Sequence, residues 1–374
     1  MIYLDNAATT PVCKPAIEET RRIYEEAFFN PSATYRQGII AKKEISLARE
    51  KIAKILDCNP TRLYFTSCAS ESNNWVFAAT LKNQKHNVVI SAGEHASVYE
   101  CAKSYKNKGF DVRIASLNSN GSVNIDSLLS LVDENTALVS VIHSSNETGV
   151  VNDLATIVSQ VKAKNSKTLV HSDGVQAFLK TTISLEEVGV DFYSVSGHKI
   201  GAPKGVGLLY SKKNIPPLIV GGGQENGFRS GTENVAGIVS LGVAVEEFAK
   251  LKESSSLSAI VNDFESFLID ELGAEIVGRK TNRTGFVTCA LLDGIRAEIL
   301  QTMCCDDDLI VGRGSACSSK QRGNRVLQEI GIPLKKIDGA LRFSYSPKTT
   351  EEELITASVI LKKNVNLLRG HRIG

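Results

Sequence analysis

One lysine directly follows a predicted strand and is well suited to covalent chemistry. Residues 194–199 read Ser-Val-Ser-Gly-His-Lys, and Gly201 and Pro203 then turn the chain sharply. A lysine forms a Schiff base only when its amine is neutral, which requires firm positioning and partial removal from water. The end of a strand would supply that positioning for Lys199. A solvated lysine at a strand end is the alternative, and this segment alone does not decide between the two.

Three further segments carry groups that suit a flat ring with a phosphate. Asp173 follows another apolar run, where a carboxylate could pair with a pyridinium nitrogen or simply cap a helix. Residues 66–74 place small residues at the start of a predicted helix, where backbone N–H groups suit a phosphate or a capping box. His95 follows a third apolar run and could stack on a ring or move protons, although a lone histidine is usually structural.

Among the eight cysteines, one has unusual neighbours. None is spaced as Cys-x-x-Cys or lies near a paired histidine motif, so we expect no metal site and no disulfide framework. Cys317 lies between Gly314 and Gly323 in a stretch of small polar residues, where a flexible loop would let its thiol reach both a pocket and an outside acceptor. Arg313 and Lys320 could lower the pKa of that thiol. A surface thiol without function is the alternative.

The elements that must position these residues follow an alternating pattern. Apolar runs of five to seven residues, typical of strands buried on both faces of a sheet, occur at residues 87–92, 111–117, 137–143, 168–172, 192–196 and 206–210. Stretches with helical spacing separate some of them, for example residues 97–106 and 154–164. This alternation predicts an α/β domain with a mainly parallel sheet, and ligands usually bind such sheets at the strand ends.

The pattern changes after about residue 250. Helices are expected at residues 257–271, 297–304, 324–330 and 351–366, and strands at residues 284–291, 309–312 and 340–345. This order predicts a separate α+β unit. We therefore expect a large domain of residues 13–250, and a small domain of residues 1–12 and 251–374 that carries the Cys317 loop.

Composition excludes several classes of protein. The chain has 374 residues, 22% of them charged, and a net charge of +2. Nothing in this balance favours nucleic acid or an anionic membrane as a partner. No apolar run approaches the ~18 residues that a membrane-spanning helix needs. The N-terminal residues have neither the basic region nor the apolar core of a signal peptide, so we expect a cytoplasmic protein.

Nine segments of the chain stand in the order found in one enzyme family. They are residues 5–11 (DNAATTP), 71–74 (ESNN), 93–95 (GEH), 146–150 (NETGV), 173–176 (DGVQ), 196–199 (SGHK), 229–232 (RSGT), 314–317 (GSAC) and 341–344 (LRFS). From residue 5 to about residue 353 the chain resembles the NifS/IscS-type cysteine desulfurases, which are class V aminotransferase-like pyridoxal-phosphate enzymes of fold type I. Residues 314–317 are similar to the first group of these enzymes. The resemblance implies a large α/β domain with a seven-stranded, mainly parallel sheet and a smaller α+β domain.

The resemblance also implies a reaction. L-cysteine would become L-alanine with pyridoxal phosphate as the cofactor, and the sulfur would pass through a persulfide on Cys317 to an acceptor protein. Lys199 would hold the cofactor covalently, and His95 would stack on its ring and act as acid or base. Asp173 would face the ring nitrogen, and Gln176 the phenolic oxygen.

The remaining site residues are also assigned by the resemblance. The phosphate would be held by Ala69, Ser70, Ser196 and His198, and Thr232 would reach the phosphate of the neighbouring subunit, so the active unit would be a homodimer. The substrate would be bound by Asn30, Asn146 and Arg342, with Arg342 gripping its carboxylate.

The chain departs from the family pattern in several places. Phe29 and Tyr35 stand where glycine and histidine are usual, and Ser70 stands where threonine is usual but keeps the hydroxyl. Residues 318–325 carry three basic residues in place of a more neutral loop. These changes affect the partner more than the chemistry, so an iron–sulfur scaffold and a tRNA thiolation enzyme both remain open as acceptors.

Two alternative functions use the same residues. A selenocysteine lyase would differ in its preferred substrate. A scaffold that binds the cofactor within a sulfur-modification complex would need neither Lys199 nor Cys317, and the presence of both argues against it. Cys304 and Cys305 precede an acidic run that reads as a turn after a helix, with an accessory sulfur relay as the alternative.

Overall fold

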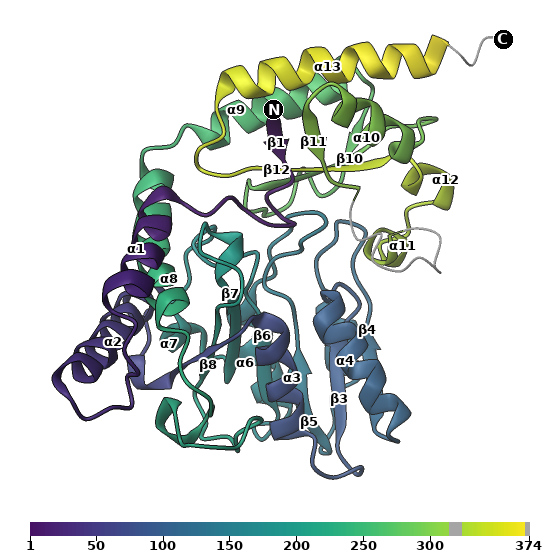
Figure 1. Cartoon of the computed structure of the whole chain (residues 1–374). Helices are drawn as coiled ribbons and strands as arrows, with labels where there is room; N and C mark the ends of the chain where they lie inside the picture. The colour runs from purple at the N-terminus through teal and green to yellow at the C-terminus, as the bar shows by residue number, and fades with distance from the viewer. Residues whose placement is uncertain (314–323, 371–374) are drawn as a thin grey trace.

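The computed structural model describes residues 1–313 and 324–370, and its largest feature is a seven-stranded sheet. The strands lie in the order β2-β8-β7-β6-β5-β3-β4 (Figure 1). Their bounds are β2 Leu63–Thr66, β3 Asn87–Ser91, β4 Asp111–Ala115, β5 Thr136–Ser140, β6 Leu169–Asp173, β7 Phe192–Ser196 and β8 Gly207–Ser211. Strand β8 is antiparallel to both neighbours, and the pairs from β7 to β4 are parallel. The predicted mainly parallel sheet is therefore confirmed.

Helices cover both faces of this sheet, as its apolar strands require. In Figure 1, α3 and α4 lie against one face, while α1, α2 and α8 pack together at one side of the molecule. The helices of this part of the chain are α1 Lys14–Glu26, α2 Arg36–Leu56, η1 Pro60–Arg62, α3 Ala69–Thr80, α4 Ala96–Asn107, α5 Ile125–Ser130, α6 Leu154–Lys164, α7 Leu185–Val188, η2 Gly197–Lys199, η3 Glu225–Gly227 and α8 Val235–Glu253.

A smaller unit follows in the chain and lies above the main sheet in Figure 1. Its antiparallel sheet has the order β12-β10-β9, and β1 pairs with β11 in parallel beside it. Its elements are β1 Ile2–Leu4, α9 Leu257–Asp270, β9 Glu275–Ile276, β10 Val287–Leu291, α10 Ala297–Asp306, β11 Leu309–Val311, α11 Arg325–Glu329, α12 Leu334–Ile337, β12 Ala340–Ser344 and α13 Glu351–Gly370.

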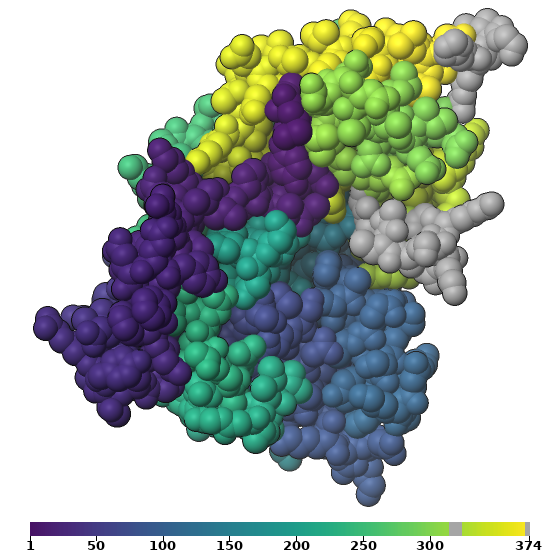
Figure 2. Space-filling view, viewed as in Figure 1, coloured from purple at the N-terminus to yellow at the C-terminus, as the bar shows by residue number. Residues whose placement is uncertain are grey.

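The first residues of the chain belong structurally with its last third. Strand β1 pairs with β11, and in Figure 2 the purple N-terminal segment lies against the green and yellow C-terminal unit before it descends to α1. This pairing favours the small domain of residues 1–12 and 251–374, and the exact boundary stays a prediction.

Some elements differ from their sequence-based prediction. Strand β4 was expected to be buried on both faces, but it lies at the edge of the sheet, with Asp111 and Ile114 exposed. Strand β10 begins three residues later than predicted, because Gly285 takes a left-handed φ of +72°. Helices α1, α2 and α8 and strand β2 were not among the predicted elements. Among the residues described, no helix is long and apolar enough to cross a membrane.

Candidate active site

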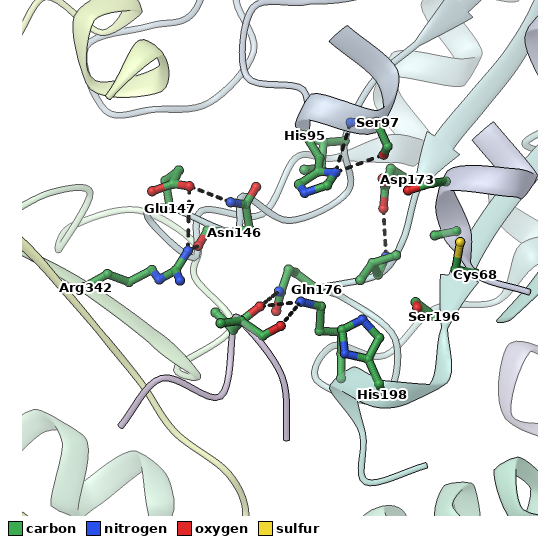
Figure 3. Close-up of a pocket in the computed structure, with 17 residues that line it drawn as sticks. Cys68, His95, Ser97, Asn146, Glu147, Asp173, Gln176, Ser196, His198 and Arg342 are labelled. Atoms are coloured by element: carbon green, nitrogen blue, oxygen red, sulfur yellow. Dashed lines mark hydrogen bonds and ion pairs between the residues drawn. The ribbon is translucent and has the colours of Figure 1, made fainter. Parts of the chain in front are cut away.

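A cavity of ≈ 320 Å³ opens at the carboxyl ends of the central strands (Figure 3). Its walls come from β6, β7, the starts of α3 and α4, the segment after β1, and β12 of the smaller unit. Ten of the predicted site residues line it: Ala69, Ser70, His95, Asn146, Asp173, Gln176, Ser196, His198, Lys199 and Arg342. Parallel strands bring residues far apart in sequence to one edge of a sheet, which explains this convergence.

Lys199 lies at the end of η2, directly after β7. Its Nζ donates to the backbone carbonyls of Ala7 and Ala8, at 2.7 and 2.6 Å. Burial, together with the positive charge of Arg342, lowers the pKa of Lys199 to about 8, although Asp5 and Asp173 oppose the shift. A substantial fraction of the amine is thus neutral near physiological pH. A freely solvated lysine, the alternative left open by the sequence, is therefore wrong.

Asp173 ends β6 and is only 2% exposed. Its carboxylate accepts hydrogen bonds from Asn73 Nδ2 at 2.9 Å and from the backbone N–H of Val175 at 3.1 Å. Gly174 allows this tight turn, because a Cβ atom there would lie 1.9 Å from Cζ of Tyr193. Asp173 is therefore held rigidly and still lines the cavity, where it can face a positively charged nitrogen.

The start of α3 offers backbone donors to an anion. The N-cap residue Cys68 makes no side-chain capping bond, so the expected capping box does not form there. Glu71 instead accepts from the backbone N–H of Ser67 at 2.8 Å and pairs with Arg229. Within the described chain, no acceptor binds the N–H groups of Ala69 and Ser70. Free N–H groups at the N-terminus of a helix of this length suit a phosphate.

Two histidines line the cavity. Burial, with the charges of Lys199, Lys204 and Lys180, lowers the pKa of His198 to about 4, so its ring is neutral. Its Nδ1 lies 3.1 Å from Thr9 Oγ1. His95 is exposed at the start of α4, where its Nδ1 accepts from the backbone N–H of Ser97 at 3.2 Å. His95 therefore caps α4 and also presents its ring to the cavity.

Arg342 supplies the positive charge on the other side of the cavity (Figure 3). It is 8% exposed, and its guanidinium donates to Asp5 Oδ1 at 2.9 Å and to the backbone carbonyl of Asn146 at 3.0 Å. Asn146 Nδ2 donates in turn to Glu147 Oε1 at 2.6 Å. Among the described residues, Arg342 Nε has no hydrogen-bond partner. A buried, unpaired donor of this kind is suited to the carboxylate of a small ligand.

Two of the predicted residues that the structure describes do not line this cavity. Asn30 is exposed on the loop between α1 and α2, where its Oδ1 accepts from the backbone N–H of Ser32. Thr232 is exposed beside the Glu71–Arg229 pair, which is compatible with a reach towards another subunit. Cys317 lies outside the described residues, as does Lys320.

Several residues at the site were not predicted from the sequence. The backbone carbonyls of Ala7 and Ala8 and the side chain of Glu147 stand inside recognised motifs and line the cavity. The buried Lys180, which no motif marked, contacts the lining residue Gln176.

The other cysteines are poor candidates for sulfur chemistry where they are buried. Burial raises the pKa of Cys304 to about 11 and that of Cys289 to about 12, so neither is a ready thiolate. Cys305 is exposed in the last turn of α10, and its relay role stays a prediction. Arg313 forms an ion pair with Glu298 at 3.6 Å, and its effect on the pKa of Cys317 stays a prediction.

Comparisons with known proteins place the chain in a family. The model of the class V aminotransferases matches residues 2–356. The chain belongs to the class V aminotransferase family. Within it, this family member is 33% identical to cysteine desulfurase 2 of Trichormus variabilis, over 99% of the chain and 94% of the relative. It is also 33% identical to the cysteine desulfurase IscS of Dictyoglomus turgidum, over 98% and 95% of the two chains.

Solved structures agree with this placement. A NifS-like protein superposes with a TM-score of 0.91 at 35% identity, covering 98% of this chain and 99% of the other. A structure of SspA in complex with cysteine superposes with a TM-score of 0.83 at 30% identity, covering 94% and 100%. This class V aminotransferase is therefore one of the cysteine desulfurases, and the predicted fold type I is confirmed.

Proposed function

We propose that this protein converts L-cysteine to L-alanine and holds the released sulfur as a persulfide on Cys317. The observation that carries the proposal is the environment of Lys199. Its amine, with a pKa lowered to about 8, shares one cavity with the buried carboxylate of Asp173 and the buried guanidinium of Arg342. This set of groups suits an amino acid bound beside a cationic ring.

The residues of the cavity fit pyridoxal phosphate. Lys199 offers a partly neutral amine to an aldehyde, and Asp173 offers a carboxylate to a pyridinium nitrogen. Ala69 and Ser70 offer free backbone N–H groups to a phosphate. When bound, pyridoxal phosphate withdraws electrons from the α-carbon of an amino acid and so makes bonds near that carbon easier to break.

The chain's own residues then have distinct tasks. Arg342 would grip the substrate carboxylate through its unpaired Nε, and Asn146 would fix the orientation of the substrate from the same side. Lys199 Nζ, once released, would remove the proton from the α-carbon of the substrate. An amine with a pKa of about 8 is well matched to that task near neutral pH.

The sulfur step belongs to Cys317. Its thiolate would attack the sulfur of the substrate, so that a sulfur–sulfur bond forms and the carbon–sulfur bond breaks. The electron pair of the broken bond stays with the carbon fragment, which takes up a proton and leaves as alanine. The persulfide would then pass its outer sulfur to an acceptor protein, whose identity stays open.

We also propose a homodimer. Large apolar side chains are exposed along α1, α2 and the loop between them: Ile17, Tyr24, Phe28, Tyr35, Ile39, Ile40, Leu47 and Ile55. Such a concentration on one side is typical of an interaction surface. The rings of Phe29 and Tyr35, two of the departures from the family pattern, pack edge to face beside this surface, with their centroids 6.3 Å apart.

Turnover of L-cysteine tests the proposed function directly. The purified protein loaded with pyridoxal phosphate should release equal amounts of alanine and sulfide when a reductant is present. Lys199→Ala should abolish alanine formation, whereas substitution of the exposed neighbour Lys204 by alanine should leave it largely intact. A loaded, folded protein that forms no alanine from L-cysteine would overturn the proposal. A much higher turnover of L-selenocysteine would favour a selenocysteine lyase instead.

A further inference from the structure

A second lysine, Lys180, is buried directly behind the cavity. It is 6% exposed and follows Leu179, a residue that takes a left-handed φ of +64°. A non-glycine residue in this conformation is strained, and the surrounding structure must hold it there. In the described chain, no carboxylate forms an ion pair with Lys180. A buried lysine without a counter-charge is costly, which indicates that its position has a use.

A hydrogen bond from the side chain of Lys180 leads to the site. Its Nζ donates to Gln176 Oε1 at 2.7 Å, and Gln176 Nε2 donates to the backbone carbonyl of Ala7 at 3.0 Å. The same carbonyl of Ala7 accepts from Lys199 Nζ at 2.7 Å. A chain of hydrogen bonds therefore connects the buried lysine to Lys199 through the side chain of Gln176.

This arrangement fixes which end of the Gln176 amide faces the cavity. The backbone carbonyl of Ala7 can only accept a hydrogen bond, and in this structure the Nζ–H of Lys180 donates to Gln176. The amide must therefore turn Oε1 towards Lys180 and Nε2 towards Ala7 and the cavity. Without Lys180, Oε1 would lose its buried donor, and the Ala7 carbonyl alone would hold the amide in this orientation.

We propose that Lys180 is a positioning residue for the reaction: it holds Gln176 so that the cavity presents an N–H donor, and not an oxygen, to the phenolic oxygen of pyridoxal phosphate. This inference rests on the proposed function. A donor at that oxygen stabilises its anionic form. Burial and the charges of Lys199 and Arg342 lower the pKa of Lys180 to about 7, and so the lysine also belongs to the electrostatic environment of the site.

The test reads the cofactor spectrum and not turnover. In the loaded wild-type protein, the visible absorbance should change with pH as the link between Lys199 and the cofactor loses its proton. Lys180→Met keeps the length of the side chain but removes its donors. Loss of the fixed donor and of a nearby positive charge should both raise the pKa of that change, by about one unit.

Two controls separate positioning from other effects. Lys252 Nζ donates to the backbone carbonyls of Leu179 and Lys180, so Lys252→Met disturbs the same turn without touching Gln176, and it should leave the spectral pKa unchanged. In a Gln176→Ala background, Lys180→Met should give a clearly smaller shift, because only the loss of charge then remains. If Lys180→Met does not fold, Lys180→Gln, which fills the site but removes the ammonium group, should give a shift in the same direction.

Different results would contradict the positioning role of Lys180 and the proposed function of the protein. An unchanged spectral pKa in folded Lys180→Met, or an equally large shift in the Gln176→Ala background, would overturn the positioning role. A wild-type protein that shows no visible band with pyridoxal phosphate would instead overturn the proposed function.

Discussion

Burial lowers the pKa of Lys199, and the fraction of neutral amine should therefore control how fast the cofactor attaches. Only the neutral amine can attack the aldehyde of pyridoxal phosphate, and the pKa of Lys199 is about 8. The rate of cofactor attachment to the cofactor-free protein should therefore rise with pH, about tenfold per unit well below that value, and level off above it. Stopped-flow absorbance after mixing measures this rate. A rate that keeps rising towards the pKa of an ordinary lysine would contradict the assigned environment.

Substitution of Cys317 should affect the sulfur step and leave substrate binding intact. Cys317→Ser should still bind L-cysteine and shift the cofactor spectrum, because those steps depend on Lys199 and Arg342. Alanine formation should fall by about a thousandfold or more, because a hydroxyl is a poor nucleophile towards sulfur. Substitutions of Cys304 and Cys305 by serine or alanine are the matched controls, and they should keep most of the activity.

Mass spectrometry after a brief pulse of L-cysteine identifies the sulfur carrier. The added sulfur should appear on the peptide that contains Cys317. If it appears instead on the peptide with Cys304 and Cys305, the assignment of the nucleophile is wrong and the exposed Cys305 becomes the first candidate.

At the scale of elements, two ion pairs fasten the glycine-rich segment that precedes α8 to helices α3 and α2, and one hydrogen bond ties it to strand β2. Arg229 pairs with Glu71 in the first turn of α3 at 2.8 Å, and Glu225 pairs with Arg49 and accepts from the backbone N–H of Phe65 at 3.0 Å. Arg229 is thus the link between the predicted phosphate site and the segment that carries Thr232.

Arg229→Ala should weaken both folding and cofactor binding. Removal of a charged hydrogen-bond partner from a partly buried pair should cost about 1–3 kcal/mol in the free energy of unfolding, measured by urea titration. The apparent affinity for pyridoxal phosphate should fall as well, because Glu71 loses its partner next to the phosphate. Lys103→Ala removes the exposed pair with Glu100 and should change the free energy of unfolding by less than ~0.5 kcal/mol. An equal effect of the two substitutions would show that the Arg229 contact has no special role.

At the scale of the whole molecule, the apolar surface on α1 and α2 predicts self-association. Phe28→Glu places a charge at the centre of that surface, on a side chain that is 67% exposed in the single chain. It should shift the protein from dimer to monomer in sedimentation experiments and reduce turnover, because Thr232 would no longer reach the second site. Val359→Glu, on α13 at 65% exposure, is the matched control and should leave the dimer intact. An active monomer would contradict the shared site.

The sequence by itself determined the features that depend on local pattern. The alternation of apolar runs and helical stretches predicted the parallel sheet, and β7 appeared at the predicted residues. The placement of Lys199 and Asp173 at strand ends predicted that they would meet, because parallel strands end at one edge. The resemblance added Arg342 and Asn146, which no local pattern marked.

Only the tertiary structure decided features that depend on distance and burial. The contact of Gln176 with Ala7, the pairing of β1 with β11, and the partners of Arg342 join residues that lie far apart in the sequence. The exposed edge of β4 follows from strand order, which an apolar run does not specify. The charge state of a lysine is likewise not visible in the sequence. Packing around Lys199 and Lys180 removes water from their amines and so lowers both pKa values.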